Sequence, residues 1–85
     1  REIGWLTLPP GASIGEHKHT DNEDVYIIVS GKGVFTDSTG KQTEVGAGDI
    51  TIARPGQSHA LKNIGKEPLV FLDLIAETVA AQAAK

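Results

Sequence analysis

The 85-residue sequence contains no cysteine. Disulfide bonds, thiolate metal ligands and cysteine nucleophiles are therefore excluded. Basic residues are also few, because 8 Lys and Arg stand against 11 Asp and Glu, which gives a formal net charge of −3. Without a basic stripe to neutralise phosphates, we expect no nucleic-acid partner.

Long apolar runs are absent as well. No run approaches the roughly 20 apolar residues of a membrane-spanning helix, and no signal-peptide pattern opens the chain. We therefore expect no membrane partner and, by default, a cytoplasmic location. The sequence also has no Gly-x-Ser-x-Gly elbow, no phosphate-cradling loop and no dinucleotide fingerprint, so serine-based nucleophilic catalysis has no support.

What the sequence does contain is a series of short apolar segments separated by Gly, Pro, Asn and Asp. The expected strands are 3–8, 13–19, 24–30, 34–36, 42–45, 50–53, 59–64 and 69–75. Short strands with this spacing predict an all-β sandwich or barrel. The alanine-rich residues 77–85 predict a short helical tail. The length predicts one domain, 1–85, and the opening on Arg1 in place of methionine leads us to expect a trimmed or processed polypeptide.

The run that follows Asp24 is apolar on both faces of its expected strand. A two-residue period places Asp24 and Tyr26 on one face and Val25, Ile27 and Val29 on the other. A barrel wall normally alternates between apolar and polar positions, so the second apolar face needs a cover. We expect this outward face to form a homodimer interface.

The three histidines lie in two distant segments. His17 and His19 are one residue apart, and His59 lies within residues 54–63. If the first two lie on a strand, both imidazoles point to the same face, which provides half of a mononuclear metal site. Taken alone, such a pair is more often a pair of surface histidines, and the residues by themselves leave both interpretations open.

Two motifs around these histidines resemble those of the cupin family. The first reads Gly11-x5-His17-x-His19-x4-Asp24-x6-Gly31, and the second reads Gly48-x6-Pro55-Gly56-x2-His59-x3-Asn63. Together they cover residues 11–63 in the order that the family has, and as a pair they are specific.

The resemblance implies an antiparallel jelly-roll-type barrel (a double-stranded β-helix) with a metal held inside by His17, His19, Asp24 and His59. The family usually has glutamate where this chain has Asp24, so the neighbouring Glu23 is the alternative fourth ligand. The implied cofactor is one divalent transition metal ion per chain. Imidazole and carboxylate ligands suit Fe, Mn, Ni, Cu or Zn, and the sequence does not choose among them.

Arg54, Gln57 and Tyr26 are candidate substrate-binding residues. Arg54 stands near His59 in a turn where the family commonly has proline, and its guanidinium could hold a carboxylate or phosphate. The alternative for Arg54 is a surface ion pair. Gln57 offers an amide near the metal, and Tyr26 offers a phenol, although a tyrosine in such a run is more often a core residue than a site residue. Asn63 is expected to be structural, bonding backbone at a strand end.

The resemblance implies a metalloenzyme acting on a small oxygen-rich organic molecule, in the dioxygenase, decarboxylase or isomerase classes. The same pocket could instead bind or sense a small ligand without turnover. A third hypothesis is a barrel retained for oligomerisation with a vestigial site. The sequence leaves the substrate and the reaction open.

Overall fold

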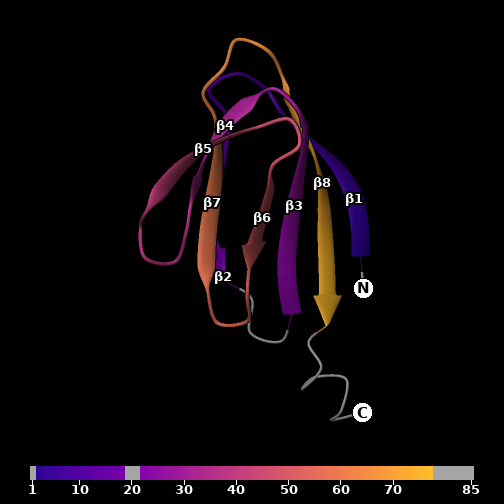
Figure 1. Ribbon diagram of the computed structural model, residues 1–85, viewed down its shortest axis with the longest axis vertical. Coiled ribbons are helices and arrows are strands. Elements are labelled where there is room, and N and C mark those ends of the chain that lie inside the picture. Colours follow the sequence, from indigo (N-terminus) through magenta and orange to yellow (C-terminus); the bar gives the residue numbers. More distant parts are fainter. Residues whose placement is uncertain (1, 19–21, 78–85) are drawn as a thin grey trace.

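The computed structural model describes residues 2–18 and 22–77, and of residues 2, 15–18 and 77 only the backbone. This described part forms eight antiparallel strands in two four-stranded sheets (Figure 1). The first sheet has the order β1 (Glu2–Leu8), β8 (Leu69–Glu77), β3 (Asn22–Ser30) and β6 (Ile50–Ala53). The second has the order β2 (Ser13–Lys18), β7 (Ser58–Asn63), β4 (Lys32–Thr36) and β5 (Gln42–Gly46). The expected all-β antiparallel class is confirmed.

The predicted C-terminal helix finds no support. Glu77, the first residue of that prediction, is the last residue of β8, where it pairs with Asn22 of β3. The ladder with β3 extends β8 past the apolar run, because a short alanine-rich segment has little helical stability of its own in water. Residues 78–85 lie outside the described residues. Within 2–18 and 22–77, nothing helical is long and apolar enough to traverse a bilayer.

The core lies between the two sheets. Residues directly opposite each other on antiparallel strands share a face, and burial alternates over residues 24–28 of β3, with Asp24, Tyr26 and Ile28 buried. The apolar core cluster joins both sheets and consists of Tyr26, Ile28, Leu69 and Phe71 from the first and Phe35, Val45 and Leu61 from the second. The predicted orientation of β3 is therefore confirmed.

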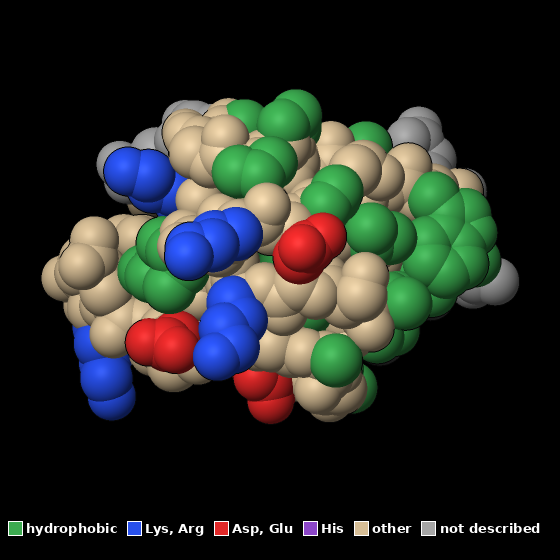
Figure 2. Space-filling view, turned by 90° about the horizontal axis from the view of Figure 1, so that it is seen from above, with side chains coloured by type: hydrophobic (Ala, Val, Ile, Leu, Met, Phe, Trp, Pro, Cys, Tyr) green, Lys and Arg blue, Asp and Glu red, His purple; other side chains and the backbone are tan. Residues whose placement is uncertain are grey.

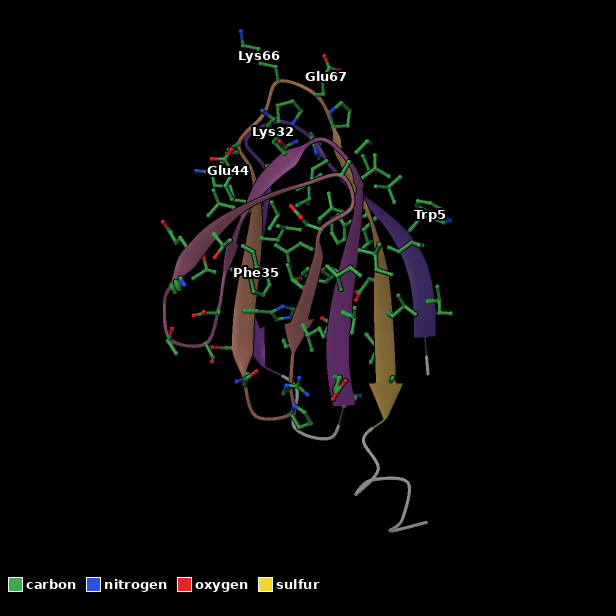
Figure 3. All side chains as sticks on the ribbon, in the orientation of Figure 1. Trp5, Lys32, Phe35, Glu44, Lys66 and Glu67 are labelled. Atoms are coloured by element: carbon green, nitrogen blue, oxygen red, sulfur yellow. The ribbon has the colours of Figure 1, made fainter. Side chains whose placement is uncertain are left out.

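The other face of the first sheet is also apolar. Its paired residues form two rows across all four strands, which we call the outer apolar face: Ile3–Leu74–Val25–Ile52 and Trp5–Leu72–Ile27–Ile50. Trp5 is 65% exposed and Ile50 is 60% exposed. Trp5 projects away from the molecule at the β1 edge (Figure 3). Seen from above, hydrophobic side chains gather on the β1 side, while charged side chains of both signs cover the middle (Figure 2).

Asn63 ties the strand ends together where β7 ends. Its Nδ2 donates to the carbonyl oxygens of Leu8 and Glu67, both at 2.8 Å, and its Oδ1 accepts from the Gly65 N–H at 2.9 Å. The side chain is only 1% exposed. The predicted structural role of Asn63 is confirmed.

Candidate metal and ligand site

The site is built around one contact between the two sheets. His59 on β7 and Asp24 on β3 are each 1% exposed, and His59 Nε2 lies 3.1 Å from Asp24 Oδ2. Both residues occupy inward positions of their strands, which explains how two polar side chains from distant sequence segments meet in the core. The pair brings an imidazole nitrogen and a carboxylate oxygen together in a space shielded from water.

Two aromatic rings pack against the imidazole of His59. The Tyr26 ring stacks on it with centroids 4.9 Å apart at an interplanar angle of 22°, and the Phe35 ring meets it edge-on at 5.9 Å and 66°. Burial raises the pKa of Tyr26 far above its ordinary range, and the carboxylates of Asp24 and Asp73 and a side-chain hydrogen bond with Asp24 raise it further. Tyr26 therefore remains a neutral phenol that donates toward Asp24.

For the other two predicted ligands, His17 and His19, the structure describes only the backbone of His17. In the pairing of β2 with β7, the backbone of His17 lies directly opposite that of His59. The His17 side chain and the whole of His19 lie outside the described residues. Among the residues that the structure does describe, no group of three or more His, Asp or Glu is placed to hold a metal ion. The four-residue ligand set stays a prediction, of which the structure brings together Asp24 and His59.

The alternative ligand Glu23 lies elsewhere. Its side chain is 36% exposed, and its Oε1 is 3.6 Å from Nη1 of Arg54, which is 65% exposed. Arg54 therefore forms the surface ion pair that was one of its two interpretations, and its role in holding an anion stays a prediction. Gln57 closes the turn, because its Oε1 accepts from the Arg54 N–H at 2.9 Å and its own N–H donates to the Arg54 carbonyl at 3.0 Å.

A cavity of about 250 Å³ opens beside His59, between β6 and the hairpin that joins β4 to β5. One side of it is apolar, formed by Phe35, Ile52 and Ala53. The rim is polar and consists of Gln57, Ser58 and the hairpin residues Asp37, Ser38 and Thr39. Figure 3 shows the labelled Phe35 in the interior, between β7 and β6. The predicted candidate Gln57 thus lies at a ligand-sized space next to a predicted metal ligand.

Sequence reasoning missed Phe35 and Asp73. Asp73 pairs with Tyr26 across β8 and β3 and contributes to the electrostatics of its phenol. Its signal was available, because a single charged residue interrupts the otherwise apolar run 69–75. Phe35 gave no comparable signal, since its contact with His59 is created by the pairing of β4 with β7.

Both the sequence and the fold resemble those of known proteins. A family profile described as Cupin domain matches residues 4–75. A Thermotoga maritima protein named oxalate-binding protein is 43% identical over 75 residues, which are 88% of this chain and 61% of that protein. A gentisate 1,2-dioxygenase from a Ralstonia species is 34% identical over 73 residues, which are 86% of this chain and 20% of that protein. The chain thus spans less than two thirds of the length of these curated relatives.

Likeness extends to solved structures. The crystal structure of a predicted oxalate decarboxylase from Thermotoga maritima superposes with a TM-score of 0.88 at 40% sequence identity. The match covers 92% of this chain and 67% of that one. The arrangement of the two sheets therefore recurs in a structure that is related in sequence.

Proposed function

This chain belongs to the cupin family, and on that premise we propose that it binds one divalent transition metal ion and, through it, a small oxygen-rich organic molecule. The observation that carries the proposal is the buried contact of 3.1 Å between His59 Nε2 and Asp24 Oδ2. A neutral imidazole and a carboxylate are a donor pair that fits Fe, Mn, Ni, Cu or Zn.

His17 completes this donor set in the proposal. The backbone pairing puts its position directly opposite His59, and the family motif assigns a ligand at this position. His19, two residues further along the chain, is the fourth proposed ligand by its place in the family motif. This geometry supports a site in which β2 and β7 of the second sheet supply imidazoles and β3 of the first supplies the carboxylate.

Tyr26 and Phe35 would hold the Asp24–His59 pair in place and keep water away from it. The Tyr26 hydroxyl donates toward Asp24, and the Tyr26 and Phe35 rings shield the imidazole of His59 from water. The cavity beside His59 gives a small molecule access to this point. A bound metal would supply Lewis-acid polarisation of the molecule's oxygen donors. The proposed reaction class is dioxygenase, decarboxylase or isomerase.

A second candidate is ligand binding without turnover. It is favoured by the likeness to a relative that is named for binding oxalate. A panel of keto and hydroxy acids, offered under air and under nitrogen and followed by mass spectrometry, separates the two. Turnover of any member supports the enzyme, whereas saturable binding with no product supports the carrier or sensor.

Elemental analysis tests the metal itself. The purified chain, never exposed to chelator, is expected to carry close to one transition metal ion. Asp24→Asn keeps the shape of the side chain but removes the anionic donor, and we expect its metal affinity to fall at least tenfold. Asp49→Asn is the matched control, since Asp49 is an exposed turn residue whose Oδ2 accepts from the Gly46 N–H at 2.7 Å. Equal affinity of the two variants would contradict the role of Asp24.

We further propose that a second copy of the chain covers the outer apolar face. Two uninterrupted apolar rows cross all four strands there, and their outermost members, including Trp5 and Ile50, are largely exposed. Monomeric proteins rarely expose contiguous apolar patches beyond a few hundred Å². A self-complementary patch without charge suits a two-fold dimer.

A further inference from the structure

The hairpin between β4 and β5 holds a fixed negative charge at the rim of the cavity. Asp37 Oδ1 accepts hydrogen bonds from the Thr39 N–H at 2.9 Å, the Thr39 hydroxyl at 2.6 Å and the Lys41 N–H at 3.0 Å. The Thr39 hydroxyl, assisted by the two backbone N–H groups and by Lys41, holds the pKa of Asp37 below its ordinary value. The carboxylate is therefore ionised at neutral pH and held in one place.

The nearest cation that acts on Asp37 is Lys41 of the same hairpin, and it does not line the cavity. Apart from His59 at its inner end, the described residues that line the cavity are apolar or carry neutral hydroxyl and amide groups, and Asp37 is the charged one. The nearby guanidinium of Arg54 is directed to Glu23, at 3.6 Å. A ligand held at His59 would thus present its outer end to a carboxylate and to hydroxyl groups.

We propose that Asp37 is a specificity-determining residue for the ligand bound at His59. It selects small molecules whose outer end carries a hydroxyl or ammonium group and rejects those whose outer end carries a carboxylate. This inference rests on the proposed function and goes beyond it, because it names the chemistry of the ligand's outer end. The apolar side of the cavity, with Phe35 and Ala53, would accommodate the carbon chain between the two ends.

The expected size of the effect follows from Coulomb's law. Two unit charges about 6 Å apart, at an effective dielectric constant of about 40 for a partly open site, change a binding constant roughly tenfold. A neutral hydroxyl that donates to Asp37 would gain less than an ammonium group. The order in which the chain prefers these ligands therefore depends on the charge of their outer groups. A purely structural role of Asp37 would not produce such a charge-dependent order.

Four acids that differ only in their outer group provide the test. Isoserine, glycerate, lactate and tartronate share a three-carbon chain and an α-hydroxycarboxylate, and they end in ammonium, hydroxyl, methyl and carboxylate groups respectively. Each is titrated by calorimetry into the chain loaded with the metal that it takes up. We expect isoserine and glycerate to bind more tightly than lactate, and tartronate to bind about tenfold more weakly than glycerate.

Asp37→Asn removes the charge but keeps an amide oxygen that can accept the turn's hydrogen bonds. We expect tartronate to gain about tenfold in this variant, isoserine to lose a similar factor, and lactate to change less than twofold. Asp49→Asn changes the net charge equally at a turn outside the cavity and is expected to leave all four affinities unchanged.

An unchanged order of preference in Asp37→Asn, or no binding of any acid, would overturn the inference. Metal content is measured on the same samples, so a failure of the proposed function is visible separately. If the chain takes up no metal, the four acids are titrated into the metal-free chain, where the charge of Asp37 still discriminates among the outer groups.

Discussion

Asn63 satisfies three backbone groups in the interior with one side chain, and its loss should be costly. Asn63→Ala leaves the carbonyls of Leu8 and Glu67 and the N–H of Gly65 without this partner. Each lost hydrogen bond costs about 1 kcal/mol net, so we expect the free energy of unfolding to fall by about 3 kcal/mol. In a domain of this size the melting temperature would fall by about 15 °C.

Calorimetry or circular dichroism measures this shift. Gln42→Ala, a truncation of an exposed polar residue on the edge strand β5, is the control and should change stability by less than about 0.5 kcal/mol. Equal stability of the two variants would mean that Asn63 does not hold the strand ends together.

Tyr26 supports Asp24 without being a proposed ligand. Tyr26→Phe keeps the ring that stacks on His59 but removes the hydroxyl that donates toward Asp24. Removing such a partner of a metal ligand typically costs tenfold or more in affinity, so we expect about a tenfold loss in metal affinity. The free energy of unfolding should fall by about 1–3 kcal/mol, because the buried carboxylate of Asp24 loses a hydrogen-bond donor although the side-chain volume is nearly conserved. A metal titration that gives wild-type affinity would refute this positioning role.

The residues of the site were predictable to different degrees. The strand period put Asp24 and Tyr26 on the same face, and the family motif implied that this face is the inner one and singled out His59. The spacing within the same motif favoured Asp24 as the ligand and left Glu23 as the alternative. Burial now places Asp24 against His59 and Glu23 in a surface pair with Arg54, while the ligand role itself stays a prediction. The sequence could not predict Asp37 as a site residue, because its position beside His59 depends on how the hairpin between β4 and β5 folds back.

At the level of elements, the period-two pattern located the strands well. The predicted segment 50–53 coincides with β6, and 42–45 differs from β5 by one residue. The prediction failed at β4, where Gly31 to Gly33 was interpreted as a break. Only Gly31 has a positive φ, of 93°, and Lys32 and Gly33 already pair with β5. Gly33 lies within the strand for a steric reason, because a Cβ there would be 2.8 Å from Leu69 Cδ2.

The turn between β3 and β4 depends on Gly31 for two reasons. Its φ of 93° is strained for any other residue, and an added Cβ would lie 2.6 Å from the Pro68 carbonyl oxygen. We expect Gly31→Ala to lower the free energy of unfolding by about 3 kcal/mol, of which about 1 kcal/mol is the backbone strain. Urea unfolding followed by Trp5 fluorescence or circular dichroism measures the change.

Two other glycines distinguish the cost of the positive φ from the cost of the steric clash. Gly40 has a φ of 85° with open space around its Cβ position, so Gly40→Ala should cost about 1 kcal/mol. Gly46 has neither a positive φ nor a close neighbour, the nearest atom being the Gly31 oxygen at 3.7 Å, and Gly46→Ala should be nearly neutral. Equal costs at all three positions would contradict the steric account of Gly31.

For the molecule as a whole, the first sheet is apolar on both faces, because its inner face contributes Ile28, Leu69 and Phe71 to the core. Its inner face also carries the polar row Gly4–Asp73–Tyr26–Thr51, and its outer face carries two wholly apolar rows. An antiparallel sheet with one solvated face normally has polar side chains on that face. The polar inner row is explained by the site next to it, and the apolar outer rows require a covering surface.

The proposed dimer makes a specific prediction for these outer rows. Sedimentation at micromolar concentration should give twice the mass of one chain. Trp5→Lys and Ile50→Lys place charges at positions that are 65% and 60% exposed in the single chain, so both variants should remain folded. Each should weaken dimerisation at least thirtyfold, as expected where an interface anchor is worth about 2 kcal/mol. Ile64→Lys, 46% exposed and off this face, is the control and should leave the dimer intact. A wild-type chain that sediments as a monomer would contradict the proposal, because the outer apolar face would then be stable in water on its own.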